Sequence, residues 1–255
     1  MNNETVRVLL LTNNTGTLNE KIHFIKQLVN HDILIDISVN ERDADENISE
    51  DEEEVNIIGR ANSGLYDTAT SLYDKNKYKM ICVDAPQDFT EYNIEKLHDL
   101  WNNVDALILV LPRRTSGMTD IMKPETLILP VDYQLLPLKY IEQLNWLTAH
   151  AGIKIDLLHV NDNEERMESL YDDTDKIFAA DIKNKLNTTK MEFHFIRDKN
   201  DDAIGGIKEY ISKKHNYLFA ITRYNKSFFR NLFETHTSSK MEENVTVPYF
   251  VFNYD

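Results

Sequence analysis

The chain has 255 residues, enough for two compact domains, and a formal net charge of −15. This acidic balance disfavours binding to nucleic acid or to an anionic membrane, because both carry phosphates that the chain would repel. No apolar run approaches the length of a membrane span, and no early apolar stretch follows a basic region. We therefore expect a soluble, cytoplasmic protein that binds neither nucleic acid nor membrane.

Short apolar runs alternate with helical patterns in the first half of the chain. Runs rich in Val, Ile and Leu are typical of parallel strands that are buried on both faces. They predict strands at Val8–Leu11, Ile33–Val39, Tyr78–Val83 and Ala106–Leu111. Apolar residues at helical spacing predict helices at 22–29, 65–73 and 94–101. The chain's single cysteine, Cys82, falls in an expected strand, so we expect it to be buried and structural.

An acidic tract, Glu41–Glu54, separates the second expected strand from the following helix. Four of its residues match ligand positions of a calcium-binding loop: Asp43, Asp45, Asn47 and Glu54. However, Ile48 stands where such a loop needs its turn glycine, and no helical pattern precedes the tract. We therefore favour a solvated loop over a calcium site.

The second half repeats the pattern of the first and adds a strand. Apolar runs predict strands at Leu127–Val131, Lys154–Val160, Met191–Ile196, Tyr217–Thr222 and Val247–Phe252, with helices centred on 138–148, 167–186 and 203–213. Residues 7–40 align with residues 126–160, so that Ile33–Ile37 falls over Ile153–Leu157. A repeat of this length is a whole domain.

This alternation of strands and helices predicts the α/β class. We expect two tandem, doubly wound parallel-sheet domains of Rossmann-like type, residues 1–124 and 125–255. Ligands of such sheets bind at the carboxyl ends of the strands. The eight histidines show no local metal spacing, and no phosphate loop or nucleophile motif occurs. We therefore expect no enzymatic activity, no cofactor and no metal.

Several motifs of the second half occur in an order known from one family. The first strand ends in Leu129-Pro130-Val131-Asp132, the second ends in Leu158-His159-Val160, and the last contains Val247-Pro248-Tyr249-Phe250-Val251. Together they resemble the universal stress protein family over residues 126–255. The first half looks like a degenerate copy with Asn13 in place of the strand-end aspartate, and the whole resembles tandem members. Only Met118–Glu125 separates the loop after its last predicted strand from the second domain, so we expect the first domain to lack a fifth strand.

ATP-binding members of this family carry Gly-x-x-Gly and, further on, Gly-Ser/Thr after the fourth strand. Glycines let backbone N–H groups approach phosphates without a Cβ. The resemblance places Thr222, Asn225 and Thr235 at the three glycine positions and His236 at the hydroxyl position. We therefore expect the phosphate cradle to be absent.

The resemblance implies a non-enzymatic stress-response protein that acts through protein–protein contact without conventional ATP binding. The alternative is an adenine-nucleotide-binding regulatory protein with a modified site at the strand carboxyl ends of the second domain. The contacts of such a site would come from Asp132, Val160, Thr222, Asn225, Thr235 and His236. A carboxylate at Asp132 could accept a hydrogen bond from a ribose, or it could equally cap the following helix.

The resemblance also implies a homodimer through the C-terminal strand, with Val247, Tyr249 and Val251 at the interface, and leaves room for a further protein partner. The last strand of such a sheet lies at an edge, where backbone donors and acceptors are unpaired. Because no equivalent strand is expected in the first half, the pairing strand would come from a second chain.

Overall fold

The computed structural model describes residues 5–13, 15–29, 32–40, 54–61, 65–85, 99–100, 103–112, 123–131, 138–161, 176–177, 180–185, 190–197, 203–222 and 248–252. The chain divides into two compact units. The first unit comprises Met1–Lys123 and Phe233–Asn253, and the second comprises Pro124–Leu232 and Tyr254–Asp255. The division near residue 124 follows the repeat. However, the described C-terminal residues 248–252 group with the first unit, whereas the sequence placed them in the second domain.

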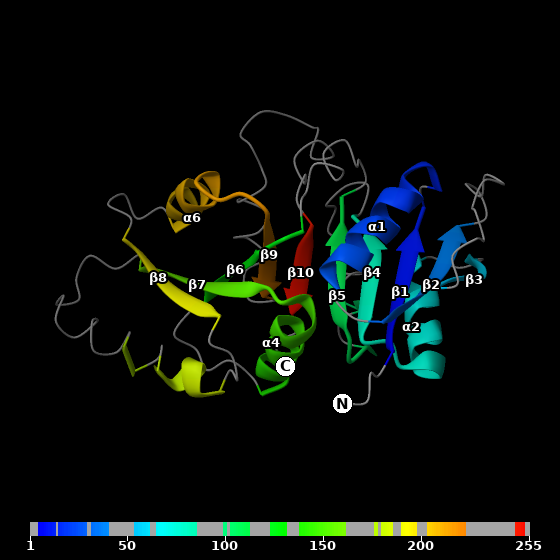
Figure 1. Ribbon diagram of the computed structural model, residues 1–255, viewed down its shortest axis with the longest axis horizontal. Coiled ribbons are helices and arrows are strands. Elements are labelled where there is room, and N and C mark those ends of the chain that lie inside the picture. Colours follow the sequence, from blue (N-terminus) through cyan, green and yellow to red (C-terminus); the bar gives the residue numbers. More distant parts are fainter. Residues whose placement is uncertain are drawn as a thin grey trace. The chain divides into compact units, whose positions relative to one another are not determined.

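Five parallel strands form most of the first unit's sheet. They are β1 (Val6–Thr12), β2 (Ile33–Asn40), β3 (Val55–Ala61), β4 (Met80–Asp84) and β5 (Leu107–Leu111), in the spatial order β3-β2-β1-β4-β5 (Figure 1). Every residue of β4 and β5 is buried, as expected for inner parallel strands. The strand order reverses at β1, which lies between β2 and β4, so the carboxyl ends of β1 and β4 form the switch point of a doubly wound sheet.

In the first unit, helices α1 (Leu18–Leu28) and α2 (Leu65–Asn76) each come after a strand in the chain. A 3₁₀ turn, Thr15–Thr17, leads from β1 into α1, and α2 lies between β3 and β4 in the chain. Helix α1 buries an apolar stripe that includes Leu18, Ile25 and Leu28. Cys82 is buried in β4, as expected, and burial raises the pKa of its thiol. No described helix of either unit is long and apolar enough to cross a membrane.

Strand β3 was not predicted from the sequence, which assigned only four strands to the first half. It lies at the outside of the sheet and pairs with β2. Ile57 and Ile58 are 42% and 37% exposed, and Gly59 and Arg60 follow them. An outer strand is not buried on both faces, so it lacks the continuous apolar run by which inner strands are recognised. The expectation that residues 1–124 lack a fifth strand is therefore wrong.

The C-terminal strand of the chain, β10 (Tyr249–Phe252), pairs antiparallel with β5 in the first unit. The register joins Tyr249 to Val110 and Val251 to Ile108, and all four residues of β10 are buried. This corrects the argument that Tyr249 and Val251 need a strand from a second chain. The first half does have a fifth strand, and pairing within one chain needs no second molecule. Val247 lies outside the described residues.

The second unit has the same doubly wound α/β pattern. Its described strands are β6 (Thr126–Val131), β7 (Lys154–Asn161), β8 (Met191–Arg197) and β9 (Tyr217–Thr222). They are parallel, in the spatial order β9-β6-β7-β8, so the strand order reverses at β6. Helices α4 (Leu138–Ala151) and α6 (Ala203–Ser212) lie close to the ranges expected from the sequence. The predicted α/β class and tandem arrangement are confirmed.

Candidate functional site

The switch point of the first unit is where a doubly wound sheet is expected to receive a ligand. Thr12 is the last residue of β1 and Asp84 is the last residue of β4, and these two strands are neighbours in register. The chain leaves β1 through the 3₁₀ turn and enters α1, which brings Lys21 back over the strand ends. Three polar side chains therefore meet at this point.

A closed hydrogen-bond network joins these three side chains. The Lys21 ammonium donates to Asp84 Oδ1 at 2.5 Å and to Thr12 Oγ1 at 2.9 Å. The Thr12 hydroxyl and the backbone N–H of Asn13 donate to Asp84 Oδ2 at 2.8 Å and 2.9 Å. The Lys21 and Asp84 side chains are 0% and 2% exposed. We call this cluster the Lys21–Asp84 network.

The charges of the Lys21–Asp84 network cancel. A buried ammonium alone would attract a phosphate, but its nearest acceptor is a carboxylate of the same chain. Asp84 in turn already accepts from the hydroxyl and backbone donors at the strand end. The network therefore offers a nucleotide neither net positive charge nor a free backbone donor from Asn13.

The network could have been suspected from the sequence, because Lys21 falls on the apolar stripe of α1, three residues after Leu18 and four before Ile25. A cation on a buried helix face needs a buried partner. Its partner, Asp84, lies 63 positions further along the chain, so no local pattern links them.

Two of the six site residues predicted from the sequence lie on described strands at the corresponding edge of the second unit. Val160 lies in β7 and Thr222 ends β9, and these strands flank β6. The backbone at these two positions is therefore at the expected carboxyl edge. Asp132, Asn225, Thr235 and His236 lie outside the described residues, as does the calcium-like tract except Glu54.

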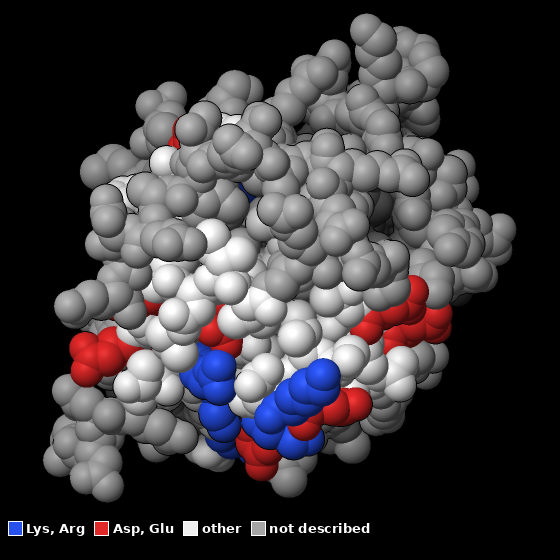
Figure 2. Space-filling view, turned by 90° about the vertical axis from the view of Figure 1, so that its right-hand side faces the viewer, with Lys and Arg blue, Asp and Glu red and all other residues white. Residues whose placement is uncertain are grey.

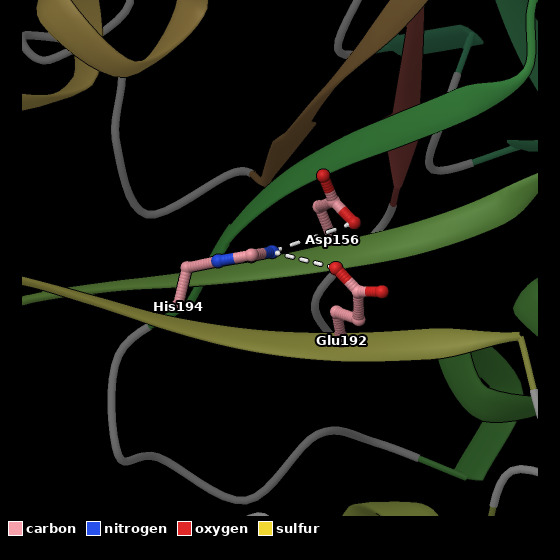
Figure 3. Close-up of side chains that lie close together, drawn as sticks. All are labelled: Asp156, Glu192 and His194. Carbon is pink, nitrogen blue, oxygen red and sulfur yellow. Dashed lines mark ion pairs between the residues drawn. The ribbon is translucent and has the colours of Figure 1, made fainter.

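A second polar cluster lies nearer the amino ends of β7 and β8. Asp156 on β7 is fully buried, and Glu192 and His194 on β8 point toward it (Figure 3). The His194 Nε2 atom lies 3.6 Å from Asp156 Oδ1 and 3.5 Å from Glu192 Oε2. The sequence prediction missed this cluster because cross-strand register, rather than a local motif, brings the three residues together.

Cations and a phenol surround the Asp156 carboxylate. Asp156 Oδ2 accepts from the Tyr210 hydroxyl at 2.8 Å and from the Lys214 ammonium at 2.9 Å. Burial raises the Asp156 pKa, but these two bonds and the charge of Lys154 outweigh burial, so the pKa lies below its usual value. The Tyr210 pKa is raised to about 12, first by burial. Asp156 is therefore a carboxylate at neutral pH.

No known family model matches the sequence, and no curated protein matches it. Solved structures share its fold. A protein from Pseudomonas aeruginosa assigned to the universal stress proteins has a TM-score of 0.56 and 12% identity, over 98% of this chain and 92% of its own. A universal stress protein from Archaeoglobus fulgidus has a TM-score of 0.50 and 12% identity, over 97% and 96%.

A third solved structure, the cytoplasmic domain of a prokaryotic cation chloride cotransporter, has a TM-score of 0.57 and 8% identity, over 97% of this chain and 95% of its own. The same fold thus serves proteins with different descriptions, and at these identities the likeness shows the fold alone. Since the universal stress protein structures are matched over nearly their whole length, this chain has the α/β fold of the tandem universal stress proteins.

Proposed function

We propose that this chain is a cytoplasmic, non-enzymatic stress-response protein of the tandem universal stress protein type. It acts through contact with other proteins and does not bind ATP in the family's usual way. The observation that carries this proposal is the Lys21–Asp84 network, which fills the switch point of the first unit with an internal ion pair. The replaced glycines at Thr222, Asn225 and Thr235 support it for the second unit.

A phosphate cradle depends on backbone N–H groups that face the ligand and on a surrounding positive charge. In the first unit the Asn13 N–H is bonded to Asp84, and Lys21 is neutralised by the same carboxylate. A nucleotide would have to break both interactions and leave Asp84 near its own phosphates. That cost opposes binding.

Titration calorimetry with Mg-ATP and Mg-ADP tests this proposal on the full chain. We expect no binding tighter than about 10 μM, which corresponds to roughly −7 kcal/mol. A variant with Thr222→Gly, Asn225→Gly and Thr235→Gly is the matched control, because it restores the glycines and should gain affinity. Wild-type binding below that constant would overturn the proposal.

The alternative, a regulatory protein that binds adenine nucleotides in the second unit, draws on one observation. Val160 and Thr222 lie on the two strands that flank β6, so their backbone is at the edge where such a ligand binds. Its contacts would include Asp132. Native mass spectrometry of freshly purified protein distinguishes the two functions, because this alternative predicts a co-purified nucleotide that Asp132→Ala loses.

The outer strand β3 supports a role in protein contact. Ile57 and Ile58 are both exposed on it, and β3 pairs with β2 at the outside of the sheet. Figure 2 shows one face of the molecule, on which uncharged side chains lie between Lys or Arg and Asp or Glu side chains. An outer strand with apolar side chains is a ready site for another protein.

Affinity capture from stressed cells tests this contact with matched variants. Ile57→Asp combined with Ile58→Asp should lose the captured protein, because it places charges on the outer strand. Ile177→Asp is the control, since Ile177 is 70% exposed but lies in the second unit. Equal capture by the wild type and the β3 variant would show that β3 is not the contact surface.

A further inference from the structure

The two units contain equivalent buried aspartates with different surroundings. Asp36 on β2 and Asp156 on β7 occupy matching positions of the repeat, and both are 0% exposed. Each accepts one bond from a tyrosine and one from a cation on Oδ2. The donors to Asp36 are Tyr78 and Arg7, and those to Asp156 are Tyr210 and Lys214.

The two units differ in what surrounds the other carboxylate oxygen, Oδ1, of each aspartate. In the first unit, Asn56 is the cross-strand neighbour of Asp36, and its amide donates to Asp36 Oδ1 at 3.3 Å. In the second unit, the cross-strand neighbour of Asp156 is Glu192, which can only accept when ionised. Among the residues that the structure describes, Asp156 Oδ1 consequently has no hydrogen-bond donor. The same holds for His194 Nε2, which has no hydrogen-bond partner there, although both atoms are buried.

Two inward-facing carboxylate oxygens and an imidazole nitrogen are a ligand set that suits Zn²⁺. The three atoms lie within 4.8 Å of one another. The His194 Nε2 distances to Asp156 Oδ1 and Glu192 Oε2 are 3.6 Å and 3.5 Å. A tetrahedral zinc ion with bonds of about 2.0–2.2 Å separates its ligands by about 3.3–3.6 Å. The two distances from His194 Nε2 therefore fit zinc coordination better than direct hydrogen bonding.

A lysine already serves as the cation in this cluster. The Lys154 ammonium lies 2.6 Å from Glu192 Oε2 and 3.5 Å from Asp156 Oδ1, so it contacts the same two oxygens that a metal ion would use. Its side chain is 33% exposed and can withdraw toward solvent. Tyr210 and Lys214 hold the opposite oxygen of Asp156, which keeps Oδ1 directed at the cluster.

We propose that Asp156 Oδ1, Glu192 Oε2 and His194 Nε2 form a binding site for a divalent transition-metal ion of the zinc type, with water as the fourth ligand and Lys154 as a competing cation. The ion would join β8, the outer strand of the second unit, to β7. With Nε2 as the ligand, the other ring nitrogen of His194, Nδ1, would carry the ring proton. The first unit has no such site at Asp36, since Asn56 and Arg7 satisfy that carboxylate.

The proposal is tested by titrating tag-free, full-length protein with Zn²⁺ in a competition assay against a coloured chelator. We expect one ion per chain, with a dissociation constant below about 10 μM. His194→Ala should weaken binding at least about tenfold, since it removes a ligand. Lys154→Met should strengthen binding by about the same factor, because it removes the competing ammonium. His150→Ala, which changes a histidine on α4, should leave affinity unchanged.

Thermal unfolding supplies an independent readout. Zn²⁺ should raise the melting temperature of the wild type and of Lys154→Met, but not that of Glu192→Gln, which keeps the shape of the side chain and loses its charge. Circular dichroism before titration verifies that each variant is folded. The proposal is overturned if wild-type protein binds no Zn²⁺ up to about 100 μM. It is equally overturned if folded His194→Ala and Glu192→Gln both bind as tightly as the wild type.

Discussion

Removing Lys21 tests the ion pair at the switch point of the first unit. In Lys21→Met the ammonium is lost while Asp84 stays 2% exposed beside the Thr12 hydroxyl and the Asn13 N–H. Breaking a buried pair by removing one partner costs about 3–5 kcal/mol, because the other charge stays buried without compensation. Asp84→Asn should lower the free energy of unfolding by a similar amount, because it leaves the buried Lys21 ammonium without its carboxylate partner. The chain lengths of lysine and methionine are close, so little of this cost is cavity formation.

The double variant Lys21→Met, Asp84→Asn removes both charges, so its cost should fall about 1–3 kcal/mol below the sum of the single costs. Urea denaturation followed by fluorescence and circular dichroism measures each free energy of unfolding. The control is Lys26→Met, on the same helix, which removes the 2.9 Å ion pair of Lys26 with the exposed Glu54. It should cost no more than about 1 kcal/mol. If Lys21→Met costs as little as this control, or if the two single costs add, the network is not the coupled pair described above.

Three further outcomes are expected. Phe250→Ala should destabilise the first unit by about 3–5 kcal/mol in denaturant titration, since Phe250 is fully buried opposite Leu109. Light scattering of this variant should show the same oligomeric state as the wild type. Dissociation of a dimer would contradict the pairing of β10 with β5 within one chain. The lowered Asp156 pKa stabilises the fold above the unfolded pKa of about 3.9, and this stabilisation is lost as pH falls through the lower folded pKa. Asp156→Asn should therefore flatten the acid limb of a stability–pH curve, and an unchanged limb would refute the assignment. Cys82 should react with a thiol reagent only as fast as the first unit opens, because it is fully buried; rapid labelling of native protein would contradict that burial.

At the carboxyl edge of the second unit, the sequence predicted part of the candidate site. The motifs near Val160 and Thr222 placed the backbone of these residues at the ends of β7 and β9, as observed. The sequence did not predict Asp84 at the switch point of the first unit. The repeat pointed to Asn13, which directly follows β1, whereas the carboxylate of Asp84 lies on β4 and is joined to β1 through Lys21 and Thr12.

The sequence alone determined the inner strands, helices α1, α2, α4 and α6, and the tandem order, because burial on two faces or on one helical stripe leaves a short-range pattern. It also determined that Cys82 is buried. The helices predicted at 94–101 and 167–186 lie mostly outside the described residues. The sequence did not predict strand β3, because an outer strand with Ile57 and Ile58 exposed has no such pattern.

Only the tertiary structure decided which distant residues meet. It paired β10 with β5 in one chain, joined Lys21 to Asp84, and set the register that brings Glu192 and His194 to Asp156. The reason is physical: helical and strand periodicity arises from neighbours within a few residues, whereas register and buried ion pairs depend on how the whole chain closes on itself.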